Sequence, residues 1–138
     1  MIKETMRGED FIALVVEVLM RDERVVFAYL YGSVVTGGRM HDVDIAVFAG
    51  PGRNPHELSA DLKVALHAAS GLPPDAFDVR VLNEVFERGD VFGLLYLRNV
   101  LSSGLVLVDK DPDLRAECIE LYSRRYRECE GMIKEVLA

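Results

Sequence analysis

Two short apolar segments on either side of a glycine-rich loop constrain the fold of this chain more than any other feature. Residues 24–31 (RVVFAYLY) are a run of β-branched and aromatic residues that ends at Gly32, which is typical of an interior strand. Residues 32–44 hold three glycines and then pass into the alternating pattern DVDIAVF. The sequence therefore predicts two strands joined by a tight loop.

The rest of the chain alternates between helical and strand patterns. Its 138 residues, half of them hydrophobic, suit one domain with a core of its own. Further strands are predicted at 76–82 and 105–108, and helices at 10–21, 55–69, within 84–101, and 112–137. We therefore expect a single domain over residues 1–138, with an α/β (α+β) fold in which helices pack against a small mixed sheet.

The charge balance excludes some partners. Sixteen lysines and arginines against 23 acidic residues leave a net charge of -7, which argues against a nucleic-acid or anionic-membrane surface. No apolar run approaches the roughly 18 residues of a membrane span, and no secretory segment is evident. We expect a cytoplasmic protein without direct nucleic-acid or membrane contacts. A small phosphate ligand stays possible, because it needs only local donors or a metal.

Asp42 and Asp44 are the first candidate site. Two residues apart in a strand, they project from one face. Like charges about 4 Å apart repel by roughly 4 kcal/mol at an effective dielectric near 20, so a bound cation would explain the pair. Carboxylates combined with substrate phosphates suit magnesium. The alternative is that both lie on a solvated strand edge, where their charge blocks aggregation.

The loop before this pair offers candidate phosphate ligands. Gly32 and Ser33 follow a buried strand, where a turn can aim backbone amides at an anion and the Ser33 hydroxyl adds a donor. Taken alone, such a turn is mostly structural. Arg39 in the same loop is a candidate phosphate contact or a solvated side chain. Phosphate donors beside metal-binding carboxylates indicate phosphoryl chemistry.

The segment YGSVVTGGRMHDVDIAVF at 31–48 resembles the signature of the minimal, or MNT-type, nucleotidyltransferases of the DNA polymerase beta superfamily. The residues that match this signature are Gly32, Ser33, Gly37, Asp42 and Asp44, and Asp78 fits the third carboxylate of the family by its place at a strand start. The resemblance implies the polymerase beta-like nucleotidyltransferase fold.

The resemblance also implies roles for these residues. Asp42 and Asp44 would hold magnesium on the phosphates of ATP, and Asp78 would share a second metal and activate the attacking hydroxyl. Gly32 and Ser33 would hold the β and γ phosphates. The reaction would transfer AMP and release pyrophosphate.

Many MNT-type proteins are antitoxins that act on a HEPN-domain toxin, so the resemblance implies such a partner in a hetero-oligomer. The first interpretation is an antitoxin enzyme that adenylylates its toxin. The alternative is an antitoxin that neutralises by binding, with little or no catalysis. The loop between Ser33 and Asp42 is a residue or two shorter than is usual in the family, which favours the alternative. Transfer to a small molecule ranks last, because it usually needs an added substrate domain.

The C-terminal segment and Arg80 give three further predictions, on the two cysteines, on an apolar stripe and on an ion pair. In one continuous helix, Cys118 and Cys129 would lie about 16 Å apart, too far for a disulfide. The apolar stripe of that helix either packs onto the sheet or forms a partner surface. Arg80 shares a strand face with Asp78 and is expected to pair with the acidic residues or with the substrate.

Overall fold

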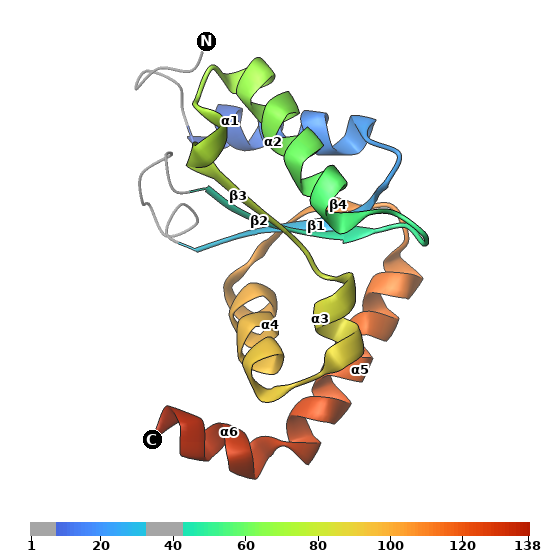
Figure 1. Ribbon diagram of the computed structural model, residues 1–138, viewed down its shortest axis with the longest axis vertical. Helices are drawn as coiled ribbons and strands as arrows, with labels where there is room; N and C mark the ends of the chain where they lie inside the picture. The colour runs from blue at the N-terminus through green and yellow to red at the C-terminus, as the bar shows by residue number, and fades with distance from the viewer. Residues whose placement is uncertain (1–7, 33–42) are drawn as a thin grey trace.

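The computed structural model describes residues 8–32 and 43–138 (Figure 1). In chain order its elements are α1 (Gly8–Arg21), β1 (Val25–Tyr31), β2 (Val43–Ala49), α2 (Pro55–Ser70), the 3₁₀ turn η1 (Pro74–Ala76), β3 (Phe77–Val81), α3 (Asn83–Arg88), α4 (Val91–Ser103), β4 (Leu105–Asp109), α5 (Pro112–Glu128) and α6 (Glu130–Leu137). All four predicted strands are present, within a residue or two of the expected ends.

The four strands form one mixed sheet in the order β3-β2-β1-β4. Strand β1 pairs antiparallel with both β2 and β4, whereas β2 and β3 are parallel. The predictions of a mixed sheet and of an interior strand at 24–31 are therefore confirmed. β3 and β4 are the two edge strands.

Helices cover both faces of the sheet. Figure 1 shows α1 and α2 above the sheet and α3, α4 and α5 below it. Alternate residues of β2 face the two sides of the sheet. Val43, Ile45 and Val47 belong to the core between the sheet and helices α1 and α2, and Ala46 belongs to the second core, between the sheet and helices α3 and α4. This two-sided burial explains why the central strands are almost continuously apolar.

The helical pattern at 84–101 is two helices rather than one. Gly89 ends α3 in the left-handed conformation, with φ 59°. Asp90 then begins α4, because its side chain accepts a hydrogen bond from the Gly93 N–H at 2.7 Å. The break turns the chain between two short helices, α3 and α4, which pack on each other under the sheet.

The prediction of one continuous terminal helix is wrong. Cys129 leaves the helical conformation at φ -101°, ψ 8°, and separates α5 from α6. The change of direction brings α6 back against α4 and buries Ile133, which a straight helix would carry away from the core (Figure 1). Cys118 is buried and Cys129 half-buried, and both are free thiols.

The apolar residues of the terminal segment fall into a buried group on α5 and a more exposed group on α6. Leu114, Cys118 and Tyr122 join the second core, where α5 packs on α3 and α4. Met132 and Val136 on α6 are about half-exposed. Among the helices in the described ranges, none is long and apolar enough to cross a membrane.

Candidate active site

Asp44 and Asp78 occupy the same register position on the parallel strands β2 and β3. Each is the second residue of its strand, and register partners in a sheet project from the same face. Asp44 is half-buried, and the Asp78 side chain is 49% exposed. These two residues, the acidic pair, therefore present neighbouring carboxylates at one end of the sheet, on the side of α4.

Gly32 makes room for the Asp44 side chain. Its φ of 80° lies in the left-handed region that favours glycine, and a Cβ atom at this position would lie 2.4 Å from Asp44 Oδ2. Any larger residue would displace the carboxylate. The glycine that follows β1 thus lets the backbone approach one of the two acidic side chains.

Two tyrosines flank the acidic pair. Tyr31 is the register partner of Asp44 on the antiparallel strand β1, so their side chains are neighbours on one face. The Tyr31 hydroxyl lies 2.8 Å from that of Tyr96 on α4, and the rings meet edge to face. Burial raises the pKa of Tyr31, the charges of Asp44 and Asp78 raise it further, and the hydrogen bond with Tyr96 opposes both. Tyr31 therefore stays a neutral hydrogen-bonding group near pH 7.

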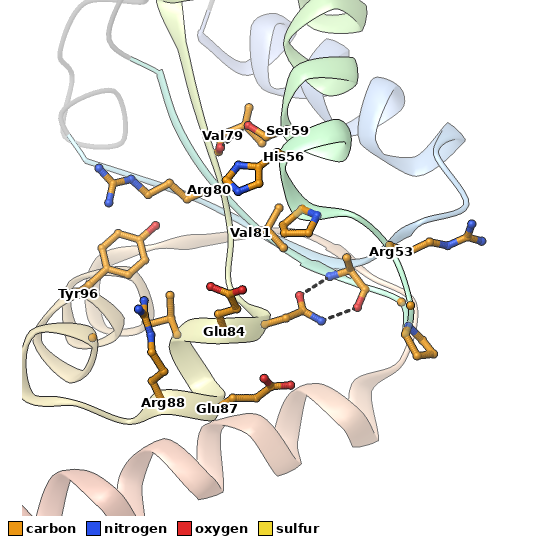
Figure 2. A pocket seen from close by; sticks show the side chains of 18 of the residues that line it. Arg53, His56, Ser59, Val79, Arg80, Val81, Glu84, Glu87, Arg88 and Tyr96 are labelled. Carbon is orange, nitrogen blue, oxygen red and sulfur yellow. Dashed lines mark hydrogen bonds between the residues drawn. The ribbon is translucent and has the colours of Figure 1, made fainter.

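Arg80 lies beside the acidic pair and contacts both Asp78 and Tyr96. Its Nε lies 3.4 Å from Asp78 Oδ2, and its guanidinium carbon lies 5.4 Å from the centre of the Tyr96 ring. Figure 2 shows the Arg80 and Tyr96 side chains on the same side of β3. Burial lowers the pKa of Arg80, but the charge of Asp78 and the two nearby tyrosines outweigh it, so the pKa is raised. The prediction that Arg80 shares a face with Asp78 is confirmed, and in this structure it pairs with that carboxylate.

The acidic pair fits a divalent metal by its donor chemistry. Two adjacent carboxylates on one face are oxygen ligands of the kind that magnesium takes, and Gly32 leaves the space that the Asp44 carboxylate occupies. Among the residues that the structure describes, no group of three or more His, Cys, Asp or Glu side chains could hold a metal. The further predicted ligand, Asp42, lies outside the described residues, as do Ser33, Gly37 and Arg39.

Tyr31 and Tyr96 were not among the site residues predicted from the sequence. Tyr31 carried a signal that could have been used, because it stands next to Gly32 at the end of a strand. Tyr96 carried none, since it reaches the site only through the packing of α4 under the sheet.

Residues 14–113 match the family model of the polymerase beta nucleotidyltransferases. The chain belongs to this family. The match spans β1, β2 and β3 and therefore includes Gly32 and both members of the acidic pair. The predicted polymerase beta-like fold is confirmed. Curated protein sequences give no significant match to the chain.

Solved structures of toxin–antitoxin complexes contain chains with the same fold. One is the Shewanella oneidensis complex of a tri-AMPylated HEPN toxin with its MNT antitoxin (TM-score 0.61, 20% identity, 96% of this chain and 100% of that chain). A second is a toxin–antitoxin complex with AMP-PNP (TM-score 0.61, 22% identity, 92% and 98%). A third is a mutant MntA–HepT complex (TM-score 0.58, 20% identity, 96% and 100%). Each of these matches covers at least 92% of both chains, so the shared fold extends over nearly the full length of this chain.

Proposed function

We propose that this chain is a magnesium-dependent nucleotidyltransferase that moves AMP from ATP to a hydroxyl group of a HEPN-domain toxin and so acts as its antitoxin. The observation that carries the proposal is the placement of Asp44 and Asp78 side by side on β2 and β3, next to Gly32, in a member of the polymerase beta nucleotidyltransferase family. Carboxylates on one face beside a glycine turn supply the metal and phosphate contacts that such a transfer requires.

The proposal assigns the metal to Asp42, Asp44 and Asp78. Magnesium held there would neutralise phosphate charge and align the reacting groups. Asp78 has a second role, to accept the proton of the attacking hydroxyl. Its position at the exposed side of the pair, 49% accessible, suits contact with an incoming acceptor. Asp44, half-buried against Gly32, suits the fixed ligand.

Phosphate binding is assigned to Gly32, Ser33 and Arg39. Gly32 is the last described residue before the loop, and its position beside Asp44 puts the start of this loop next to the metal ligands. Backbone amides and the Ser33 hydroxyl would hold the β and γ phosphates, and Arg39 would add a positive charge.

The proposed reaction is an in-line displacement at the α-phosphorus of ATP. The acceptor oxygen forms a bond to this phosphorus, and the bond from the phosphorus to the oxygen that bridges the α and β phosphates breaks. The hydroxyl proton passes to Asp78 and then to water. Pyrophosphate leaves with the bridging oxygen. The products are an AMP ester of the acceptor and pyrophosphate, so atoms and charges balance without a further reactant.

The acceptor and the partner are inferred from the structural neighbours. A neighbour of matching length is bound to a tri-AMPylated HEPN toxin, and another structure contains AMP-PNP. We extend both features to this chain and place the reaction in the cytoplasm. The net charge of -7 supports a protein acceptor over a nucleic acid.

The test uses ATP labelled on either the α or the γ phosphorus, magnesium, and a HEPN-domain protein as the proposed partner. We expect the α label on the partner and no label from the γ position, because AMP is transferred and pyrophosphate is released. Label from the γ position would mean phosphoryl transfer instead. Absence of both labels would refute the enzyme.

The second candidate is an antitoxin that neutralises its toxin by binding alone. The short loop between Ser33 and Asp42 favours it, because a shorter loop offers fewer contacts to a triphosphate. In the same experiment, a stable complex that abolishes toxin activity without any label would support this candidate.

A further inference from the structure

A cavity of about 770 Å³ lies beside the acidic pair but does not include it. Its walls come from the loop at 50–53, the start of α2, strand β3, helix α3 and the start of α4 (Figure 2). We call it the edge cavity. Its volume falls in the range of ligand-binding clefts.

The edge cavity is connected to the acidic pair through two side chains. Arg80 lines the cavity and also contacts Asp78, and Tyr96 lines it and also bonds to Tyr31. Figure 2 shows Arg80 and Tyr96 on one side of the cavity and Arg53 on the other. A ligand in the cavity therefore has one end within reach of Asp78.

The floor of the cavity is the outer edge of the sheet. The Leu82 N–H donates to Val47 O at 2.8 Å, so the main-chain groups of Leu82 point toward β2. By alternation, the main-chain groups of Val79 and Val81 point away from β2. The Val79 carbonyl accepts a hydrogen bond from Ser59 Oγ at 2.7 Å. Val81, two residues further along the strand, lines the cavity, and its main-chain groups point away from the sheet. An outward-facing strand edge is the surface to which an extended peptide adds.

The side chains around the cavity suit a peptide better than a triphosphate. The exposed charges there balance, because three arginines (Arg53, Arg80, Arg88) are matched by three carboxylates (Glu84, Glu87, Asp90), and these carboxylates would repel phosphate. Phe92, in the first turn of α4, is 76% exposed at the lining of the cavity. Aromatic side chains are enriched at protein–protein interfaces, so this exposed ring favours a protein ligand.

We propose that the edge cavity holds an extended segment of the acceptor protein and delivers its hydroxyl side chain to the acidic pair past Arg80 and Tyr96. The inference rests on the proposed function and adds the place where the acceptor binds. The segment runs along β3, its main chain pairs with the outward groups of Val81, and an apolar side chain packs on Phe92. Nucleotide binding is assigned elsewhere, to the glycine turn at the end of β1.

The test compares two variants that each place a carboxylate at an exposed apolar position. Phe92→Asp alters the lining of the edge cavity. Val64→Asp is the matched control, since Val64 on α2 is 61% exposed and does not line the cavity. For both, the rate of AMP transfer is measured against the concentration of the HEPN-domain partner, and AMP-PNP affinity is measured by calorimetry with magnesium.

We expect Phe92→Asp to raise the KM for the partner at least tenfold, with AMP-PNP affinity within twofold of wild type, and Val64→Asp to change neither. An unchanged KM in Phe92→Asp would overturn the inference. So would a tenfold loss of AMP-PNP affinity, because the cavity would then hold the nucleotide. Wild-type protein is the internal reference: if it transfers no AMP, the proposed function fails and the inference fails with it.

Discussion

The backbone at Gly32 and the carboxylate of Asp44 are so close that a Cβ atom on Gly32 would lie 2.4 Å from Asp44 Oδ2. The two residues come from the end of β1 and the start of β2, on either side of the glycine-rich loop. This contact joins the two halves of the sequence signature in space. It gives the glycine a role in the position of a proposed metal ligand as well as in the turn.

Replacement of Gly32 by alanine tests this role. The new Cβ has to push away the end of the Asp44 side chain, and the positive φ costs about 1–2 kcal/mol of unfolding free energy for any residue with a Cβ. We expect Gly32→Ala to weaken Mn²⁺ binding, followed by electron paramagnetic resonance, at least about tenfold.

Gly52→Ala is the control for Gly32→Ala. Gly52 also has a positive φ, 74°, but no atom lies within 4 Å of the Cβ that would be added. Both variants should lose similar stability in thermal unfolding, and only Gly32→Ala should lose metal affinity. Equal metal binding in the two variants would show that Asp44 does not depend on the glycine.

Arg80 is expected to compete with the metal for Asp78. The pair is exposed, with 60% of the Arg80 side chain and 49% of the Asp78 side chain accessible, so its loss should change stability by less than about 1 kcal/mol. Removal of a positive charge beside the carboxylates should tighten Mn²⁺ binding by about two- to fivefold in Arg80→Ala. Arg127→Ala, which removes the same charge from α5, should leave the affinity unchanged. Weaker binding in Arg80→Ala would instead make this arginine a support of the metal site.

The ion pair between Asp22 and Arg24 makes stability depend on pH. Arg24 Nη2 lies 2.8 Å from Asp22 Oδ2, and hydrogen bonds from Arg24 lower the pKa of Asp22 below 3.8. A lowered folded-state pKa stabilises the protein above the unfolded pKa, and this contribution is lost as the pH falls through the folded value.

Asp22→Asn removes this contribution. We expect the variant to be less stable than wild type by about 1–2 kcal/mol at pH 7, because a charge-assisted bond is lost, and the difference to shrink below about pH 4. Urea unfolding at several pH values measures it. A difference that stays constant down to pH 2 would mean that the carboxylate charge is not what stabilises the fold.

The strands were predictable because their signals are local. The apolar run before Gly32 and the alternation after Asp42 each define a strand without reference to the rest of the chain. The pairing of Asp44 with Asp78 was expected from the family resemblance alone. No local pattern specifies it, because it depends on the register of two strands that are far apart in the sequence.

The break at Cys129 and the place of Tyr96 depend on packing between elements that are far apart in the sequence, so neither was predicted. Cys129 interrupts the terminal helix two residues before Gly131, and the break buries Ile133 against α4. Tyr96 reaches Arg80 only because α4 packs under the sheet. Gly89 did carry a local signal for the break between α3 and α4, which the helical pattern around it obscured.

The catalytic role of the acidic pair is tested by the rate of AMP transfer to the HEPN-domain partner in Asp44→Asn and Asp78→Asn, compared with wild type. Asp75→Asn serves as the control, because Asp75 is exposed just before β3 and outside the acidic pair. Circular dichroism checks that every variant is folded. We predict at least a hundredfold loss of transfer in both site variants and wild-type transfer in the control. Wild-type transfer by either site variant would contradict the assignment of the acidic pair as the catalytic metal site.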